Sequence, residues 1–174
     1  METTPAILLR RTRFSETSLI LTWLTRDLGK LKTMARGALR PKSSFAGMLD
    51  LFFEVEIGLL RSQRSEIHAL REAALLTPHD GLRRDYRRVE LAAYFAALLD
   101  AMIEPEHPTP ELFALLQRAL AWLEKESPTR RAMLHFENEL ARLSGLFFEE
   151  SAYHSLRESL PFPKSRAALL EQLP

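Results

Sequence analysis

The sequence has no cysteine among its 174 residues, and this absence excludes several kinds of site. Disulfide frameworks, cysteine-ligated zinc, iron–sulfur clusters and thiol catalysis all need that side chain. Glycine is also scarce: six residues are scattered singly, so no glycine-rich loop can cradle a phosphate. No apolar run is long enough to cross a bilayer, and the N-terminal apolar stretch is too short for a secretory signal. We therefore expect a soluble cytoplasmic protein.

The charge is nearly balanced overall but unevenly distributed. The formal net charge is +1. Residues 10–42, in contrast, carry nine lysines and arginines against two acidic residues, a net of +7. Such a basic segment inside a near-neutral protein is the usual electrostatic footprint of a polyanion site. A basic face that only water contacts is the alternative, and composition alone leaves both open.

The hydrophobic pattern has a period of two before residue 77. Short apolar runs separated by turn residues predict five β-strands there. The expected strands are 6–11, 18–25, 30–37, 51–59 and 67–73. Residues 26–29 have the composition of a hairpin turn, with Gly29 supplying a positive φ. Five short strands in under 80 residues fit a small closed barrel, most often of the OB type, although the pattern does not exclude an SH3-like barrel.

After residue 77 the period becomes helical. Residues 77–80 have the form of a capping box that opens a first helix. Thr109-Pro110 and Ser127-Pro128 predict the starts of helices over about 110–125 and 128–144. Phe147 continues the apolar stripe of the latter helix, Gly145 is placed to end it, and a final helical turn is expected over 165–173. The predicted fold is α+β: an OB-type five-stranded barrel over residues 1–77, followed by an α-helical domain over residues 78–174.

The third expected strand places cations on one face. Lys30, Lys32 and Arg36 alternate with apolar or small residues, so their side chains project together. Side chains on one face of a strand repeat every ~6.6 Å, comparable to the phosphate stride of an extended single strand. Binders of single strands also need aromatic stacking platforms. We expect Trp23 in the core, whereas Phe14 and Phe45 are open to either stacking or packing.

Two blocks of specific order and spacing lie in this basic region. The first runs from Arg10 to Leu21, and the second joins Thr25-x-x-x-Gly29-Lys30-Leu31 to the run from Ala35 to Ser43. A looser block runs from Phe136 to Leu146. Together they resemble the RecO family of recombination mediators. The resemblance implies an N-terminal OB fold followed by a helical domain, in agreement with the periodicity.

The resemblance also implies a function. Members of this family bind single- and double-stranded DNA, anneal complementary strands and help to load RecA, with RecR, RecF, RecA and the C-terminal tail of the single-strand-binding protein as partners. They are not enzymes. Many carry a four-cysteine zinc module after the late helix, which a chain without cysteine cannot build, so no metal or other cofactor is expected here. The alternative is a protein-interaction scaffold that docks RecR or the single-strand-binding protein with little DNA affinity of its own.

The resemblance assigns phosphate contacts to individual positions. The predicted DNA-binding residues are Lys30, Lys32, Arg36, Arg40 and Lys42, with Arg10, Arg11 and Arg13 widening the patch. A second cluster, Arg83, Arg84, Arg87 and Arg88, is a solvated face, a second DNA contact or a cationic rim for an acidic protein tail. We expect Glu16 to hold a backbone amide or a neighbouring arginine. His135 and Glu139 lack a third ligand at motif spacing and are expected to be a surface polar pair.

Overall fold

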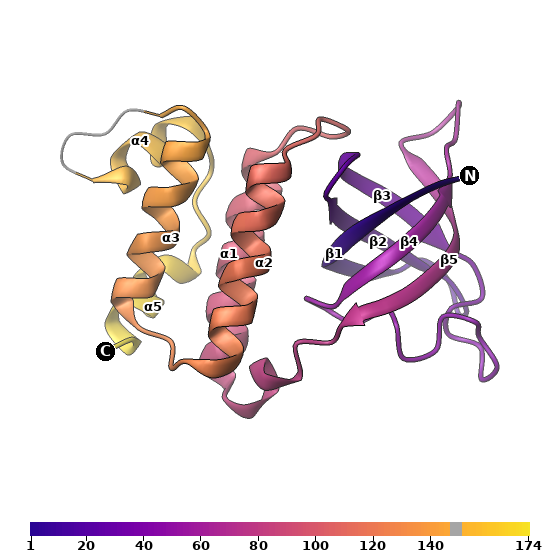
Figure 1. Ribbon diagram of the computed structural model, residues 1–174, viewed down its shortest axis with the longest axis horizontal. Coiled ribbons are helices and arrows are strands. Elements are labelled where there is room, and N and C mark those ends of the chain that lie inside the picture. Colours follow the sequence, from indigo (N-terminus) through magenta and orange to yellow (C-terminus); the bar gives the residue numbers. More distant parts are fainter. Residues whose placement is uncertain (147–150) are drawn as a thin grey trace. The chain divides into compact units, whose positions relative to one another are not determined.

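A computed structural model of the chain describes residues 1–146 and 151–174 (Figure 1). The chain divides into two compact units. The barrel unit comprises Met1–His79 and Ile103–Pro110, and the helical unit comprises Asp80–Met102 and Glu111–Pro174. Phe147, expected in the apolar stripe of the third helix, lies outside the described residues. Within the described ranges, no helix has both the length and the apolar character needed to span a membrane.

The barrel unit is built from five strands. They are β1 (Glu2–Arg13), β2 (Leu19–Thr25), β3 (Gly29–Ala35), β4 (Glu54–Leu60) and β5 (Ile67–Thr77). The sheet closes in the order β1-β2-β3-β5-β4. The pairing of β3 with β5 is parallel and the other pairings are antiparallel. The predicted OB-type barrel is therefore confirmed.

Both faces of β2 are largely covered, as its composition predicts. Leu19, Leu21 and Trp23 lie in the barrel core. The indole of Trp23 is fully buried and donates from Nε1 to Thr33 Oγ1 at 2.8 Å. Because this bond pairs the buried indole N–H, it offsets the cost of burying that group in the core. The expectation that Trp23 is a core residue is confirmed.

The hairpin turn between β2 and β3 depends on Gly29. Its φ is +75°, as predicted. A Cβ at this position would overlap the backbone of His107, so glycine is required on two grounds. The hydroxyl of Thr25 closes the turn, accepting from the amide of Leu28 at 2.9 Å and donating to the carbonyl of Gly29 at 2.7 Å.

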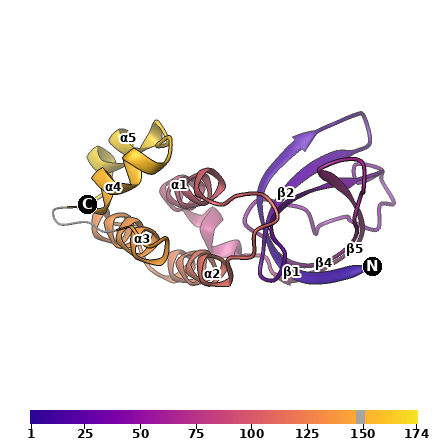
Figure 2. The same ribbon diagram turned by 90° about the horizontal axis from the view of Figure 1, so that it is seen from above.

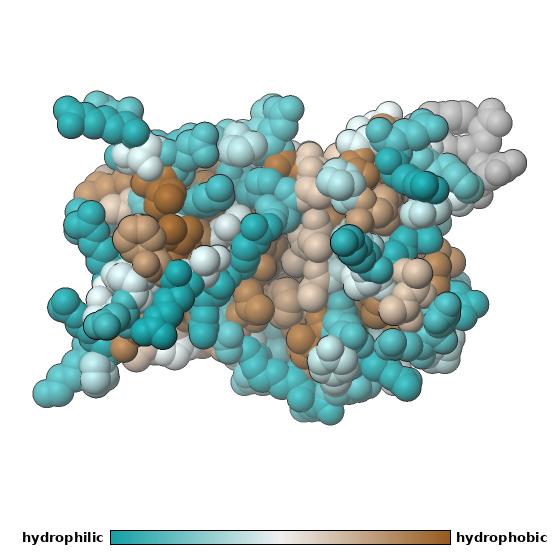
Figure 3. Space-filling model, turned by 180° about the vertical axis from the view of Figure 1, so that it is seen from behind, coloured by the Kyte–Doolittle hydropathy of each residue, from teal (hydrophilic) through white to brown (hydrophobic). Residues whose placement is uncertain are grey.

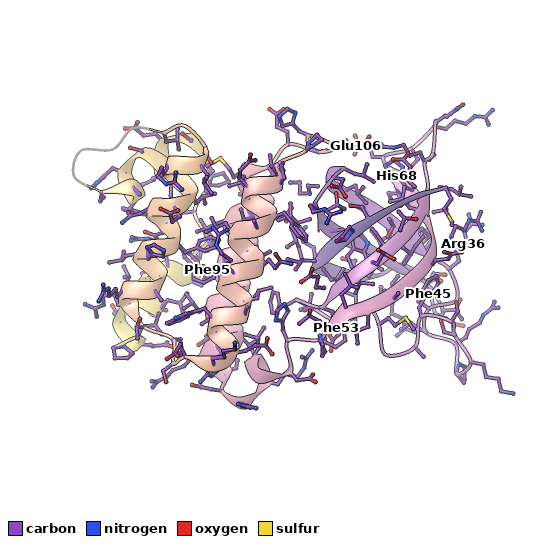
Figure 4. The ribbon with its side chains drawn as sticks, in the orientation of Figure 1. Arg36, Phe45, Phe53, His68, Phe95 and Glu106 are labelled. Carbon is purple, nitrogen blue, oxygen red and sulfur yellow. The ribbon has the colours of Figure 1, made fainter. Side chains whose placement is uncertain are left out.

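The segment 103–110 packs against the barrel, an arrangement that the sequence pattern does not indicate. The amide of Glu106 donates to the carbonyl of Lys30 at 2.8 Å. The Glu106 carboxylate lies 3.1 Å from Nε2 of His68 and 2.5 Å from Arg61, and Arg61 also contacts Glu2 at 2.7 Å (Figure 4). We call Glu2, Arg61, His68 and Glu106 the clasp. Its acidic groups mark the end of the barrel where β3 begins.

The junction between the two units differs from the prediction. Thr77 does not cap a helix: it ends β5 and pairs with Glu54 in the sheet. A 3₁₀ turn, η1 (Asp80–Arg84), follows, and α1 (Tyr86–Met102) begins only at Tyr86. The capping-box interpretation was wrong because β5 continues to pair with β4 beyond residue 73. The backbone up to Thr77, which the capping pattern assigns to the start of a helix, thus forms sheet hydrogen bonds instead.

Four further helices follow, and three of them begin close to predicted positions. The four helices are α2 (Pro110–Lys125), α3 (Arg130–Leu143), α4 (Ala152–Ser159) and α5 (Ser165–Gln172). Thr129, not Ser127, caps α3, and its hydroxyl accepts from the amide of Ala132 at 3.1 Å. Gly145 follows α3 with a φ of +71°, as predicted. Helix α4 was not predicted, whereas α5 covers most of the expected final turn.

A buried charged cluster holds the helical unit together. The Glu137 carboxylate on α3 is 2% exposed and accepts two hydrogen bonds from Arg166 on α5, at 2.8 and 2.9 Å. The Tyr94 hydroxyl on α1 donates to the same carboxylate at 2.5 Å, and Arg166 also lies over the ring of Tyr153 on α4. The cluster therefore connects α1, α3, α4 and α5, and Figure 2 shows the course of these four helices. Burial, and then the Glu137 carboxylate, raise the pKa of Tyr94.

Candidate nucleic-acid interface

The register of the sheet brings Arg10 beside the cationic face of β3. Arg10 pairs with Thr22 on β2, and Thr22 pairs with Lys32 on β3. Paired residues project from the same face of a sheet, so Arg10 and Lys32 share the outer face of the barrel. A register shift between Leu8 and Arg10 produces this placement. The sequence alone does not show the shift, because a one-residue change reverses the face of every following side chain.

Arg11 and Arg13 occupy a different position from Arg10. They pair with Leu21 and Leu19, whose side chains point into the barrel core. The pairing of β1 with β4 stops at Ile7, so this last part of β1 borders an open end of the barrel. Arg11 donates to the carbonyl of Leu49 at 3.0 Å, which holds its guanidinium at the opening.

The alternation predicted for β3 is confirmed. Leu31, Thr33 and Ala35 are buried, whereas Lys32 and Arg36 are exposed. Lys30 is half-buried, and its backbone carbonyl accepts a hydrogen bond from the segment 103–110. Lys32 and Arg36 are consequently more accessible to a polyanion than Lys30.

The loop after β3 is tied to the turn between β1 and β2. Leu39 donates its amide to the carbonyl of Thr17 at 3.0 Å, and the amide of Gly37 donates to the hydroxyl of Ser18 at 3.4 Å. Gly37 has a φ of +69°, which turns the chain at the end of the strand. Four exposed cations therefore gather at one end of the barrel. This basic end consists of Arg13, Arg36, Arg40 and Lys42.

The basic end lies far from the clasp. Strand β3 runs from Lys30, beside the segment 103–110, to Arg36, a distance of about 20 Å at ~3.3 Å per residue. In Figure 4 His68 and Glu106 mark one end of the barrel, and Phe45 and Phe53 lie toward the other. At the clasp the two carboxylates are paired with Arg61 and His68. The basic end, in contrast, gathers four exposed cations and favours a polyanion.

One further cation was missed by the sequence analysis. Arg71 on β5 is exposed. Met34 on β3 pairs with Ala69 on β5 in a parallel arrangement, and Arg36 and Arg71 each follow two residues later. Arg36 follows the last residue of β3, and the register between β4 and β5 shifts at Arg71. Arg71 is therefore a further exposed cation of the barrel unit, carried by the strand that pairs with β3.

The aromatic candidates have separate roles. Phe45 is 7% exposed and packs in the barrel core, as the packing interpretation expects. Phe14 is 61% exposed at the turn between β1 and β2, where a base could stack on it. Ser15 holds this turn, since its hydroxyl accepts from the amides of Thr17 and Ser18. That role had been expected for the Glu16 carboxylate, whereas the structure shows the Glu16 backbone carbonyl accepting from Arg13.

The second basic cluster is partly engaged within the helical unit. Arg88 donates to the carbonyls of Leu123 and Glu126, the latter at 2.5 Å. Arg83 lies 3.8 Å from Asp80, within one turn. Arg88 therefore contacts the end of α2, whereas Arg83, Arg84 and Arg87 are exposed.

A groove of about 590 Å³ runs along α2 and α3 within the helical unit. Phe95 and Phe136, whose rings stack at 3.9 Å, and Trp122 give it apolar walls. Arg118 and Arg131 supply cations at its sides. An apolar groove with cationic sides has the chemistry to hold a peptide that is both acidic and apolar.

His135 and Glu139 also line this groove. Glu139 contacts Arg142 at 2.8 Å, and this hydrogen bond holds the pKa of Glu139 below its ordinary value. Over residues 1–146 and 151–174, no group of three histidine, aspartate or glutamate side chains is arranged to hold a metal ion.

A closed five-stranded barrel with cations at one end, followed by a helical unit, places the chain among OB-fold proteins of the α+β class. Two family models match it: "Recombination protein O N terminal" over residues 1–79 and "Recombination protein O C terminal" over residues 83–160. The chain therefore belongs to the RecO family, as the sequence blocks indicate.

Individual relatives agree with the family models. The DNA repair protein RecO of Rhodopirellula baltica is 35% identical over 140 residues, which cover 80% of this chain and 52% of the relative. The DNA repair protein RecO of Synechococcus elongatus is 38% identical over 125 residues, which cover 72% of this chain and 46% of the relative. The chain thus spans about half the length of the curated relatives it matches.

Proposed function

We propose that this chain is a non-enzymatic recombination mediator that binds single- and double-stranded DNA through backbone phosphates. The observation that carries the proposal is the basic end of the barrel, together with Arg10 and Lys32, which share the outer face of the barrel. These exposed cations come from different strands and one loop of the barrel unit. Phosphate contacts of this kind are insensitive to base sequence.

Charge neutralisation also explains how such a surface would anneal strands. Two complementary strands repel each other through their phosphates, and a surface that neutralises one of them lowers this repulsion. No base readout is required, so the bases stay available for pairing. By membership of the family, we further propose that annealing and the loading of RecA involve RecR, RecF, RecA and the single-strand-binding protein.

The groove between α2 and α3 supports a second function, docking of a protein partner. Its apolar walls and the cations Arg118 and Arg131 fit an acidic and apolar peptide, the chemistry expected of the tail of the single-strand-binding protein. The exposed Arg84 and Arg87 add positive charge to the same unit. A scaffold that docks RecR or this tail with little DNA affinity is therefore the alternative function.

The test is the salt dependence of DNA binding. A labelled single-stranded oligonucleotide is titrated with the protein at several salt concentrations, and binding is followed by fluorescence anisotropy. The variant Lys32→Ala/Arg36→Ala removes two exposed cations of the barrel. It should bind more weakly and flatten the slope of log K against log salt by about 1.4, because each phosphate contact on a single strand contributes about 0.7.

A charge-matched control separates local contacts from net charge. Lys125→Ala/Arg157→Ala removes two exposed cations of the helical unit and should leave the slope within error of the unaltered protein. Equal slopes for all three proteins would refute the assigned surface. If no DNA binds even at low salt while a peptide of the acidic tail does, the scaffold function is favoured instead.

A further inference from the structure

The basic end of the barrel contains a pocket of about 220 Å³. Its apolar walls are Leu19, Phe45, Leu49 and Phe53, and Arg11 and Asp50 supply its polar groups. Pockets for drug-sized ligands occupy about 300–1,000 Å³, so this one has room for a single flat ring system and not for a whole nucleoside. Figure 3 shows apolar side chains exposed among hydrophilic ones on the surface of the barrel unit.

We propose that this pocket takes one unstacked base of a single-stranded DNA whose phosphates lie on the basic end. The inference rests on the proposed DNA binding and extends it by naming a site for the base. A base taken out of its stack exposes two apolar faces, which the aliphatic and aromatic walls of such a pocket would cover.

The polar groups of the pocket are placed for the edge of a base. Arg11 is held by the carbonyl of Leu49 at 3.0 Å and lies 3.8 Å from Asp50. A guanidinium donates hydrogen bonds and a carboxylate accepts them, so the pair offers both kinds of group to a ring edge. Every base carries an acceptor on its edge, and the pocket therefore tolerates different bases.

The charge around the pocket favours a nucleotide over an apolar side chain of a protein. Arg13, Arg36 and Arg40 are exposed at the same barrel end. A ligand that inserts a flat ring here while its chain passes these cations must carry negative charge beside the ring. A nucleotide strand has this pattern at every residue, with one phosphate for each base.

Two oligonucleotides of equal length test the proposal on the unaltered protein. One is oligothymidylate, and the other is an abasic strand with the same sugar–phosphate backbone. Because base contacts by stacking are worth about 5- to 150-fold in affinity, the base-bearing strand should bind tighter by a factor in that range. Equal affinities would overturn the pocket but leave phosphate binding intact, whereas no binding of either strand at low salt would overturn both proposals.

A plugged variant separates the pocket from stacking on the exposed Phe14. Ala46 is exposed and lines the pocket, so Ala46→Trp should fill it. The neighbouring Ser44 is exposed and is not among the lining residues, and Ser44→Trp is the matched control. Ala46→Trp should lose most of the preference for the base-bearing strand and bind the abasic strand unchanged, and Ser44→Trp should keep the preference. A full preference in Ala46→Trp would overturn the assignment.

Discussion

Replacing Arg166 by methionine would remove the partner of the carboxylate buried in the helical unit. Glu137 is 2% exposed and accepts two hydrogen bonds from Arg166. Of the three hydrogen bonds to this carboxylate described above, the variant keeps only the one from the Tyr94 hydroxyl. Methionine retains much of the length and apolar character of the arginine stem. The change therefore removes the charge and the hydrogen bonds of Arg166 but keeps most of its packing contacts.

The expected cost follows from the burial of the pair. Removing one member of a buried ion pair costs about 3–5 kcal/mol in the free energy of unfolding, because the remaining charge is uncompensated. Arg166 is itself 15% exposed, so water reaches part of the site and the lower figure of about 3 kcal/mol applies. For a chain of this length each kcal/mol lowers the melting temperature by about 2–4 °C. We expect a decrease of about 6–12 °C.

A second substitution shows whether the uncompensated charge is the cause. In the Arg166→Met background, Glu137→Gln removes the charge and keeps an amide oxygen that accepts from Tyr94. The double variant should regain about 1–2 kcal/mol over Arg166→Met alone, since no charge is then buried.

The assay is thermal and urea unfolding followed by circular dichroism at 222 nm, which reports mainly on the helices. If the double variant is no more stable than Arg166→Met, the reasoning is refuted. The loss would then come from the contact of Arg166 with the ring of Tyr153, which lies 3.7 Å from the guanidinium carbon.

Two further predictions concern the turn between β2 and β3. Gly29→Ala should destabilise the barrel unit by about 1–3 kcal/mol, because of the positive φ and the overlap with His107, and thermal unfolding of the variant measures this. Asp27 accepts a hydrogen bond from Arg26, which lowers its pKa. A carboxylate whose pKa is lower in the folded than in the unfolded protein stabilises the fold at pH values above its unfolded pKa. This stabilisation is lost as the pH falls through its folded pKa. Asp27→Asn should therefore reduce the loss of stability below about pH 4, by under 1 kcal/mol because the carboxylate is exposed, and urea unfolding from pH 5 to 2 tests this.

The local pattern of the sequence determined the elements and much of the chemistry. The period of two in β2 and β3 predicted which side chains lie inside, and Gly29 and Gly145 predicted their turns. These features depend on residues close together along the chain, where alternation and positive φ have direct steric causes. The spacing of residues in the basic segment likewise indicates the family.

The tertiary structure alone decided how distant residues meet. The register shift in β1 placed Arg10 on the outer face and Arg11 at the pocket, and the parallel pairing of β3 with β5 joined two strands that are far apart in the sequence. Sheet pairing also replaced the helix expected at Thr77 with the end of a strand. In each case the outcome depends on hydrogen bonds between segments far apart in sequence, and these bonds outweigh local preference because burial makes an unpaired backbone group costly.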